Sequence, residues 1–291
     1  MKSAVKKILK IFLLSVLGLI IVLAGAIGVL FYKVTYGFPF YDSEPPVLPA
    51  QMTDFSILVF NKTNGYRHSD AIEASTKAFQ QMAGDYGWSV FVTENGAVFN
   101  QEQLERFDLV IWNSVTGRVL KEEQKEAFIS YMKNGGGFLG IHGAGDNSHH
   151  WPWYETTLIG ADFSHHTMSP QFQEATMHLH CDSTESALCN GLKTPWKRTD
   201  EWYAFYNNPV DKGFKVLYTV DEKTYNPSGY IPFLAADKDF GMGDFHPIVW
   251  YKVLPNGGRT FYSAMGHSGT YFEESEHLEM LRRAIVWAGK K

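Results

Sequence analysis

A histidine stands where this chain builds the kind of turn that usually carries a catalytic nucleophile. Residues 135–144 read Gly-Gly-Gly-Phe-Leu-Gly-Ile-His-Gly-Ala, an apolar strand followed by a glycine-flanked turn. In a nucleophile elbow the central side chain leaves the carboxyl end of a strand and enters a cleft. His142 takes that place, so we expect an exposed base, acid or metal ligand that contributes little packing. The alternative is a glycine-rich turn with an incidental histidine.

Other histidines and one carboxylate also stand at element ends. His68 follows the first predicted strand, His166 lies in a predicted insertion, and Glu201 opens a strand. His246 precedes a late strand and His267 follows the last one. Imidazole titrates near neutral pH, which suits acid and base catalysis. Surface or packing roles are expected for the remaining histidines, with His277 on the polar side of the last helix: His149, His150, His178, His180 and His277.

Histidines with one carboxylate are also the ligand types of an open catalytic zinc site. The chain has no His-Glu-x-x-His spacing, so a divalent metal such as zinc is an alternative to metal-free chemistry. The cofactor therefore stays open at this stage.

Strands and helices alternate in the first part of the chain beyond residue 50. We predict strands at 55–60, 88–92, 108–112 and 138–141. Helices are expected from Ser69, after Asn100 and from Leu120. This alternation predicts an α/β fold, with a parallel sheet covered by helices on both faces. Ligands bind beyond the carboxyl ends of the strands in such sheets, where the loops of His68 and His142 are predicted.

The second part of the chain has a different pattern. An irregular, aromatic-rich insertion is expected at about 146–199. The chain then returns to the sheet. The predicted elements are strands at 175–180, 201–206, 214–220, 248–254 and 260–265, and a helix at 274–288. Residues 51–291 are consistent with one large domain.

The N-terminal segment has the composition of a membrane anchor. Residues 11–32 are an unbroken apolar run, long enough to span a bilayer. Four lysines precede the run and only Lys33 follows it, which predicts a cytoplasmic N-terminus at 1–10 and an extracytoplasmic main domain. A cleaved signal peptide is the competing interpretation, but the run continues past the small residues at 24–26. Residues 33–50, rich in proline, are expected to be a stiff linker that holds the domain off the membrane.

Charge and cysteine content narrow the classes of partner. All 31 acidic residues but only 21 of the 26 basic ones lie beyond residue 33, giving a formal charge of −10 there. An acidic domain disfavours nucleic acid as a partner. Cys181 and Cys189 form either a local disulfide or a pair of buried thiols. The oligomeric state stays open.

Several segments together resemble the ThuA-like, or trehalose-utilisation, family. They are the Gly-Tyr-Arg-His-Ser loop, the segment from Gly135 to Asp146, the Trp-Pro-Trp-Tyr run, and the segments around residues 198–203, 246–250 and 262–267. The resemblance covers about 55–289. It implies a class I glutamine amidotransferase-like fold with a flavodoxin-like core, and a link to trehalose-type disaccharides and keto-sugars. Phe245 departs from the pattern, because a second carboxylate is expected beside His246.

We expect an extracytoplasmic enzyme that acts on a small-molecule carbohydrate. His142 and His267, with His68 or His246, would act as acid and base, and Glu201 would orient an imidazole. Substrate contacts are expected from His166, Asp146, Trp151, Trp153, Trp202 and Tyr203, although core packing is the alternative role for these aromatic residues. A cysteine-dependent amidotransferase is disfavoured, because the elbow lacks cysteine. Metal-dependent chemistry and a non-catalytic sugar-binding module are the alternatives.

Overall fold

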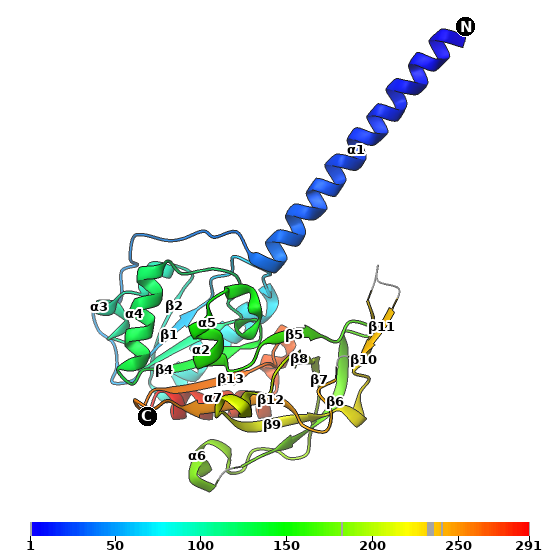
Figure 1. The fold of residues 1–291 in the computed structure, drawn as a ribbon. Coiled ribbons are helices and arrows are strands. Elements are labelled where there is room, and N and C mark those ends of the chain that lie inside the picture. The colour runs from blue at the N-terminus through cyan, green and yellow to red at the C-terminus, as the bar shows by residue number, and fades with distance from the viewer. Residues whose placement is uncertain (1, 182, 232–235, 240, 291) are drawn as a thin grey trace.

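The computed structural model describes residues 2–181, 183–231, 236–239 and 241–290, and nine of the strands in these ranges form one sheet (Figure 1). Five of them are parallel and lie in the order β2-β1-β3-β4-β13. Their bounds are Ser56–Phe60 (β1), Ser89–Thr93 (β2), Leu109–Asn113 (β3), Gly137–Ile141 (β4) and Arg259–Ser263 (β13). This 2-1-3-4-5 order is that of a flavodoxin-like sheet, which confirms the predicted fold class.

An antiparallel half extends the sheet beyond β13. It consists of β12, β9, β6 and β7, in that spatial order. The bounds are Phe172–Leu179 (β6), Trp196–Glu201 (β7), Lys215–Asp221 (β9) and His246–Val253 (β12). Two small antiparallel sheets pair β5 (Phe163–His166) with β8 (Tyr203–Phe205) and β10 (Ser228–Ile231) with β11 (Ala236–Asp239).

The segment expected to be an irregular insertion supplies two of these strands. β6 and β7 belong to the main sheet, and the strand expected at 201–206 is divided between β7 and β8. The inward positions of β7 are Trp196, Arg198 and Asp200, which are all buried. Because two of these three inward residues are charged, the apolar alternation that identifies a half-buried strand is absent from the sequence.

Helices cover both faces of the parallel half (Figure 1). Successive strand residues point to opposite faces. Trp112 of β3 stacks on Phe128 of one helix, whereas Asn113 accepts a hydrogen bond from Ser75 of another. The helices are α2 (Ser69–Tyr86), α3 (Gln101–Leu104), α4 (Glu122–Lys133), α5 (Pro152–Tyr154), α6 (Ser186–Cys189) and α7 (Ser275–Ala288). The expectation for His277 is wrong, because it faces the core from α7 and is fully buried.

The N-terminal helix α1 (Lys2–Tyr36) projects from the domain as a single rod (Figure 1). The most apolar 18-residue window of its segment Ala4–Tyr36 has a mean hydropathy of 2.8 and no buried residues, so the helix is long and apolar enough to cross a membrane. A signal sequence meets the same criteria. Contact with the domain is made by the last turns of the helix, where Tyr32 bonds Arg118 and Tyr36 stacks on His150.

The proline-rich segment after α1 does not separate the helix from the domain, contrary to expectation. Its backbone carbonyls accept hydrogen bonds from domain side chains at Glu44, Pro46 and Pro49, and Asp42 forms an ion pair with Lys62. Prolines leave the carbonyls of this segment unused by local helix or sheet pairing, so the domain surface can bind them. The segment is therefore a strap along the domain.

Cys181 and Cys189 are joined in a disulfide bond, with a Cα–Cα distance of 5.5 Å. Of the two alternatives left open by the sequence, the structure therefore has the disulfide.

The aromatic cluster under α4 gives a first prediction. Phe128 is fully buried against Trp112 and Phe138, so Phe128→Ala should lower the free energy of unfolding by about 3–5 kcal/mol. Urea titration of the full-length protein would measure the loss. Glu126→Ala on the exposed side of the same helix is the matched control and should have little effect. Equal effects of the two substitutions would contradict this account of the core.

Candidate functional site

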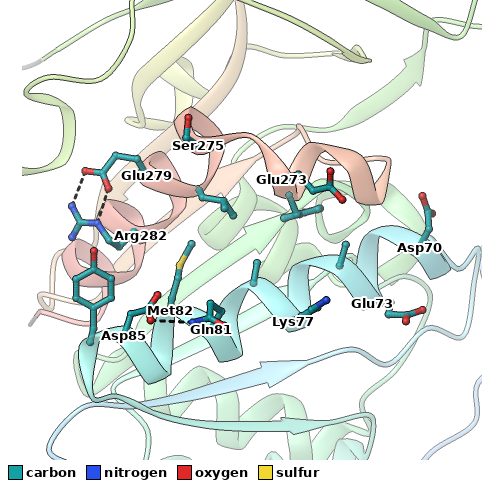
Figure 2. Close-up of a pocket in the computed structure, with 15 residues that line it drawn as sticks. Asp70, Glu73, Lys77, Gln81, Met82, Asp85, Glu273, Ser275, Glu279 and Arg282 are labelled. Atoms are coloured by element: carbon teal, nitrogen blue, oxygen red, sulfur yellow. Dashed lines mark hydrogen bonds and ion pairs between the residues drawn. The ribbon is translucent and has the colours of Figure 1, made fainter.

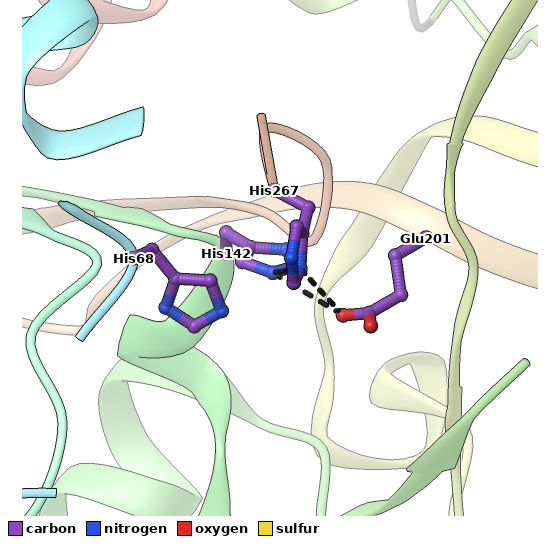
Figure 3. Close-up of side chains that lie close together, drawn as sticks. All are labelled: His68, His142, Glu201 and His267. Atoms are coloured by element: carbon purple, nitrogen blue, oxygen red, sulfur yellow. Dashed lines mark hydrogen bonds and ion pairs between the residues drawn. The ribbon is translucent and has the colours of Figure 1, made fainter. Parts of the chain in front are cut away.

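Four side chains from distant parts of the sequence converge at one point. His68 follows β1, His142 follows β4, His267 follows β13 and Glu201 ends β7. One nitrogen or oxygen atom from each lies within 4.8 Å of those of the others. Figure 3 shows the three imidazoles and the carboxylate facing one another. The three histidines come from carboxyl ends of parallel strands, which is where this class of sheet places its ligands.

The elbow at His142 has the strained backbone that the sequence predicts. His142 has φ = +46°, a left-handed conformation that is rare for a residue with a side chain. Its neighbours must be small, because a Cβ on Gly145 would lie 2.2 Å from the ring of Tyr262. The side chain is nevertheless fully buried, so the expectation of an exposed histidine is wrong. Rings of His68 and Tyr203 cover it, with centroids 4.6 and 4.4 Å away.

The contacts of His142 indicate its tautomer. Nδ1 lies 2.8 Å from the carbonyl oxygen of Ala264, so Nδ1 carries the proton and donates it. Nε2 then presents a lone pair toward His267 Nδ1 at 3.1 Å, and the Tyr203 hydroxyl donates to it at 3.1 Å. Burial raises the pKa of Tyr203 well above its usual value, so the phenol stays protonated and can donate.

Glu201 is the anionic centre of the cluster. One carboxylate oxygen lies 2.9 Å from His267 Nδ1 and 3.4 Å from His142 Nε2. The other lies 3.1 Å from His166 Nδ1 and accepts a bond from Gln171. Burial alone would raise the pKa of Glu201, but its interactions with His142, His267 and His166 outweigh burial and hold the pKa far below its usual value. Glu201 is therefore ionised at neutral pH.

The other two imidazoles differ in charge. For His267, burial opposes the charged form, but the bond to Glu201 outweighs burial and raises the pKa. For His68, burial together with nearby His142 and His267 lowers the pKa to about 2, so its ring is neutral. His68 begins α2 without capping it, and its Nδ1 is buried with no hydrogen-bond partner among the described residues. A buried nitrogen without a partner costs free energy unless something binds it.

A buried ion pair fixes the loop that carries His267. The Asp200 carboxylate accepts backbone N–H bonds from Gly266 at 2.9 Å and from His267 at 3.3 Å. Arg198, also buried, lies 3.0 Å from this carboxylate and stacks over Trp196 and Tyr271. Sequence reasoning missed Asp200 and Arg198, although their place two residues apart before Glu201 could have suggested an inward-facing pair.

A cavity of ≈ 650 Å³ lies over the cluster. This is within the ~300–1,000 Å³ range of small-molecule sites. Of the predicted substrate contacts, His166, Asp146 and Tyr203 line it together with His68, Glu201 and His267. The Asp146 carboxylate is turned toward Ser148 and His149. The lining that sequence analysis missed comprises Val34, Thr35, Tyr36, Tyr66, Asn147, Ser148, His150, Phe163, Ser164, Gln171 and Tyr206.

Besides the fully buried His142, four predicted site residues do not line this cavity: His246, Trp151, Trp153 and Trp202. Both ring nitrogens of His246 are engaged, Nε2 by the carbonyl of Tyr203 at 2.7 Å and Nδ1 by Glu222 at 2.7 Å. His246 therefore supports β8 from behind. Trp151 packs in the core beside Trp153, and the buried Trp202 donates its indole N–H to Gln173. These aromatic side chains have the packing role that was the alternative to sugar stacking.

The donor set fits a tetrahedral metal ion. Metal ligands about 2.0–2.1 Å from a zinc ion at tetrahedral angles lie roughly 3.3 Å from one another. The three edges joining His142 Nε2, His267 Nδ1 and Glu201 Oε2 measure 3.1, 2.9 and 3.4 Å. His68 supplies a fourth ring nitrogen, which lies within 4.8 Å of the other three donor atoms. These four residues could hold a divalent ion, with a neutral tautomer of His142 already set by Ala264.

A second hollow of ≈ 730 Å³ lies between α2 and α7 (Figure 2). Its polar lining consists of several acidic residues together with Lys77, Gln81, Ser275 and Arg282. None of the clustered histidines lines it. The Arg282 side chain there is paired with Glu279. We therefore place the candidate site at the histidine cluster.

Comparison with known proteins gives a family and two similar structures. A family model described as ThuA, trehalose utilisation, matches residues 56–288. A ThuA-like protein from Bacteroides uniformis ATCC 8492 is 25% identical, with a TM-score of 0.66, over 84% of this chain and 95% of that one. A second, from Parabacteroides merdae ATCC 43184, is 18% identical with a TM-score of 0.59, over 81% and 90%; this likeness shows the fold. No curated protein matches the chain.

Asp200 provides a test of how the site is held. Asp200→Asn removes the charge that balances the buried Arg198, so the free energy of unfolding measured by urea titration should fall by about 3 kcal/mol. The same change at Asp244, whose ion pair with Lys223 is exposed, should have no measurable effect. If Asp200→Asn is as stable as the wild type, the ion pair does not support this loop.

Proposed function

The chain belongs to the ThuA (trehalose utilisation) family, and we propose that it is a membrane-anchored enzyme that acts on a saccharide at the His-Glu cluster with a bound divalent metal such as zinc. The observation that carries this proposal is the convergence of four donor atoms within 4.8 Å from the ends of four strands. Three imidazoles and one carboxylate match the ligand types of catalytic zinc sites. A bound ion would polarise a sugar carbonyl or lower the pKa of a water molecule.

The surrounding residues would orient the substrate. Tyr203 and His166 lie beside the cluster on the cavity wall, where the phenol oxygen of Tyr203 and Nε2 of His166 can accept hydrogen bonds from sugar hydroxyls. Gln171 anchors Glu201 and fixes the direction of its carboxylate. The family description supports a saccharide of the trehalose type, either the disaccharide or a keto derivative. The cavity volume is large enough for such a ligand.

Metal-free acid and base catalysis is the second candidate on the same residues. It is favoured by the 2.9 Å contact of His267 Nδ1 with Glu201, which resembles the orientation of a catalytic imidazole by a carboxylate. His267 would then exchange a proton with the substrate through its other ring nitrogen. Metal content distinguishes the two candidates.

The proposed membrane anchor and its orientation are supported by the distribution of lysines in the sequence and by one structural feature, the disulfide bond. Lysines are concentrated before the apolar segment of α1, which favours a cytoplasmic N-terminus. The Cys181–Cys189 disulfide supports an oxidising compartment for the domain. We therefore place the cavity outside the cytoplasm.

Metal analysis tests the centre. The full-length protein, purified in detergent, should contain about one divalent ion per chain. His68→Ala or Glu201→Gln should remove most of it and, with it, turnover of trehalose or 3-keto-disaccharides. A chelator should lower the melting temperature of the wild type and leave that of the metal-free variants unchanged.

His178→Ala is the matched control, because the exposed side chain of His178 on β6 does not line the cavity; metal and activity should be retained. A wild-type protein that is active without stoichiometric metal would contradict the metal centre and favour acid and base catalysis. Ligand binding without turnover of any saccharide would favour a binding module.

The anchor gives a separate prediction. A reporter fused after Lys291 should be active outside the cytoplasm, and the protein should stay with membranes after a high-salt wash. Membrane fractionation and N-terminal sequencing would measure both. Release of a shortened soluble form that begins near Ile27 would show that the segment is a cleaved signal.

A further inference from the structure

The last turn of α1 forms part of the wall of the candidate site. Val34, Thr35 and Tyr36 line the same cavity as His68, Glu201 and His267. The membrane-spanning candidate and the reactive cluster are therefore adjacent, although at least thirty residues separate them in the sequence.

Several contacts hold the helix end in this place. Tyr36 stacks on His150 with ring centroids 5.2 Å apart, and Arg118 lies 3.3 Å from the hydroxyl of Tyr32. Gly37 turns the chain with φ = +68°, and a Cβ there would lie 2.8 Å from the carbonyl oxygen of Asn64. The strap that follows packs on the domain, so no free linker separates the two parts.

The length of α1 sets the depth of the cavity relative to the bilayer. If the hydrocarbon core begins after Lys10, about 20 helical residues cross its ~30 Å and reach Leu30. At 1.5 Å per residue, Val34 to Tyr36 then lie roughly 6–9 Å beyond the hydrocarbon edge, and the headgroup layer on each side is about 5–8 Å thick. Any tilt of the helix brings them closer.

The rim of the cavity has the composition of a membrane interface. Tyr36, Tyr66 and Tyr206 line the cavity and are exposed, Tyr206 with 79% of its surface accessible. Tyrosine is enriched at the headgroup level, because its ring is apolar and its hydroxyl is polar.

From these observations we infer that the cavity opens onto the membrane surface and takes the saccharide headgroup of a membrane lipid. The inference rests on the proposed function, because it assumes that the cluster acts on a saccharide from outside the cytoplasm. Anchored this way, the cluster meets its substrate by diffusion in the plane of the bilayer. A sugar free in solution reaches the same cavity only through the gap between domain and membrane.

The first test measures the depth of the cavity mouth. The native cysteines are joined in a disulfide, so a fluorescent label can be placed on a single introduced cysteine, Tyr206→Cys at the rim or Val253→Cys as control. Val253 is 47% exposed and pairs with Arg259 at the opposite end of β13. In phosphatidylcholine vesicles whose headgroups carry a nitroxide quencher, the label at 206 should lose most of its fluorescence and the label at 253 should not.

The second test compares two forms of one sugar. Full-length protein in phosphatidylcholine vesicles should melt at a higher temperature when the vesicles contain acyl-trehalose, and less so with free trehalose at the same concentration. His166→Gln on the cavity wall should remove the difference, and His178→Gln should retain it.

Each outcome bears on a different claim. Equal quenching at 206 and 253 would overturn the membrane-facing cavity and leave the metal centre untouched. Free trehalose that stabilises the protein as well as acyl-trehalose does would overturn the lipid substrate, while the proposed saccharide function stands. No response to either sugar would overturn the saccharide assignment together with this inference.

Discussion

The adjacent carboxylates of Asp200 and Glu201 join the two halves of the sheet at the candidate site. Both stand at the end of β7, in the antiparallel half, and both bind the loop after β13, in the parallel half. Asp200 binds the backbone of this loop and Glu201 binds its imidazole. Since successive residues of a strand point to opposite sides, one strand end supplies a structural anchor and a reactive carboxylate together. The position of His267, and therefore the geometry of the cluster, depends on this pair.

Burial of so many polar groups has an energetic cost that the rest of the fold must offset. His68, His142, Glu201, Asp200 and Arg198 are all nearly inaccessible to solvent. The carboxylates are matched by N–H donors and by Arg198, but the Nδ1 atom of His68 has no partner among the described residues. Buried polar groups that are only partly matched are expected where function needs them. Metal binding at these residues would add its free energy to folding, which links stability to occupancy.

The end of helix α1 and the strap that follows it are part of the structure around the cavity. The flavodoxin-like half supplies the strand ends, the antiparallel half supplies Glu201, the small β5–β8 sheet supplies Tyr203, and α1 supplies a wall of the cavity. Because the strap is bound along the domain, the helix end and the cavity move as one unit. The arrangement of the helix end against the cavity is therefore a property of the fold.

The sequence alone determined the class of fold, the anchor-like segment and most of the cluster. Apolar strands alternating with helices predicted the parallel half, and the glycines around His142 predicted the strained elbow that the backbone has. These features are local, so short patterns encode them. Their places at predicted strand ends also identified Glu201 and His267, and the resemblance to the family marks the same positions. The sequence could not show that His246, unlike Glu201 and His267, lies outside the cavity. A histidine at a strand end has the same local pattern whether it lines the cavity or supports β8.

Tertiary structure decided which of these side chains meet. The tryptophans expected to stack on sugar are in the core, where packing of large rings contributes most to stability. Strand β7 lacks the alternation of apolar and polar residues by which strands are predicted, because its inward residues include Arg198 and Asp200. Only the folded structure shows that these two charged residues are buried together as an ion pair. The burial of His142 and the closeness of α1 to the cavity depend on contacts between segments far apart in sequence. Such contacts leave no periodic signal, so only the folded chain reveals them.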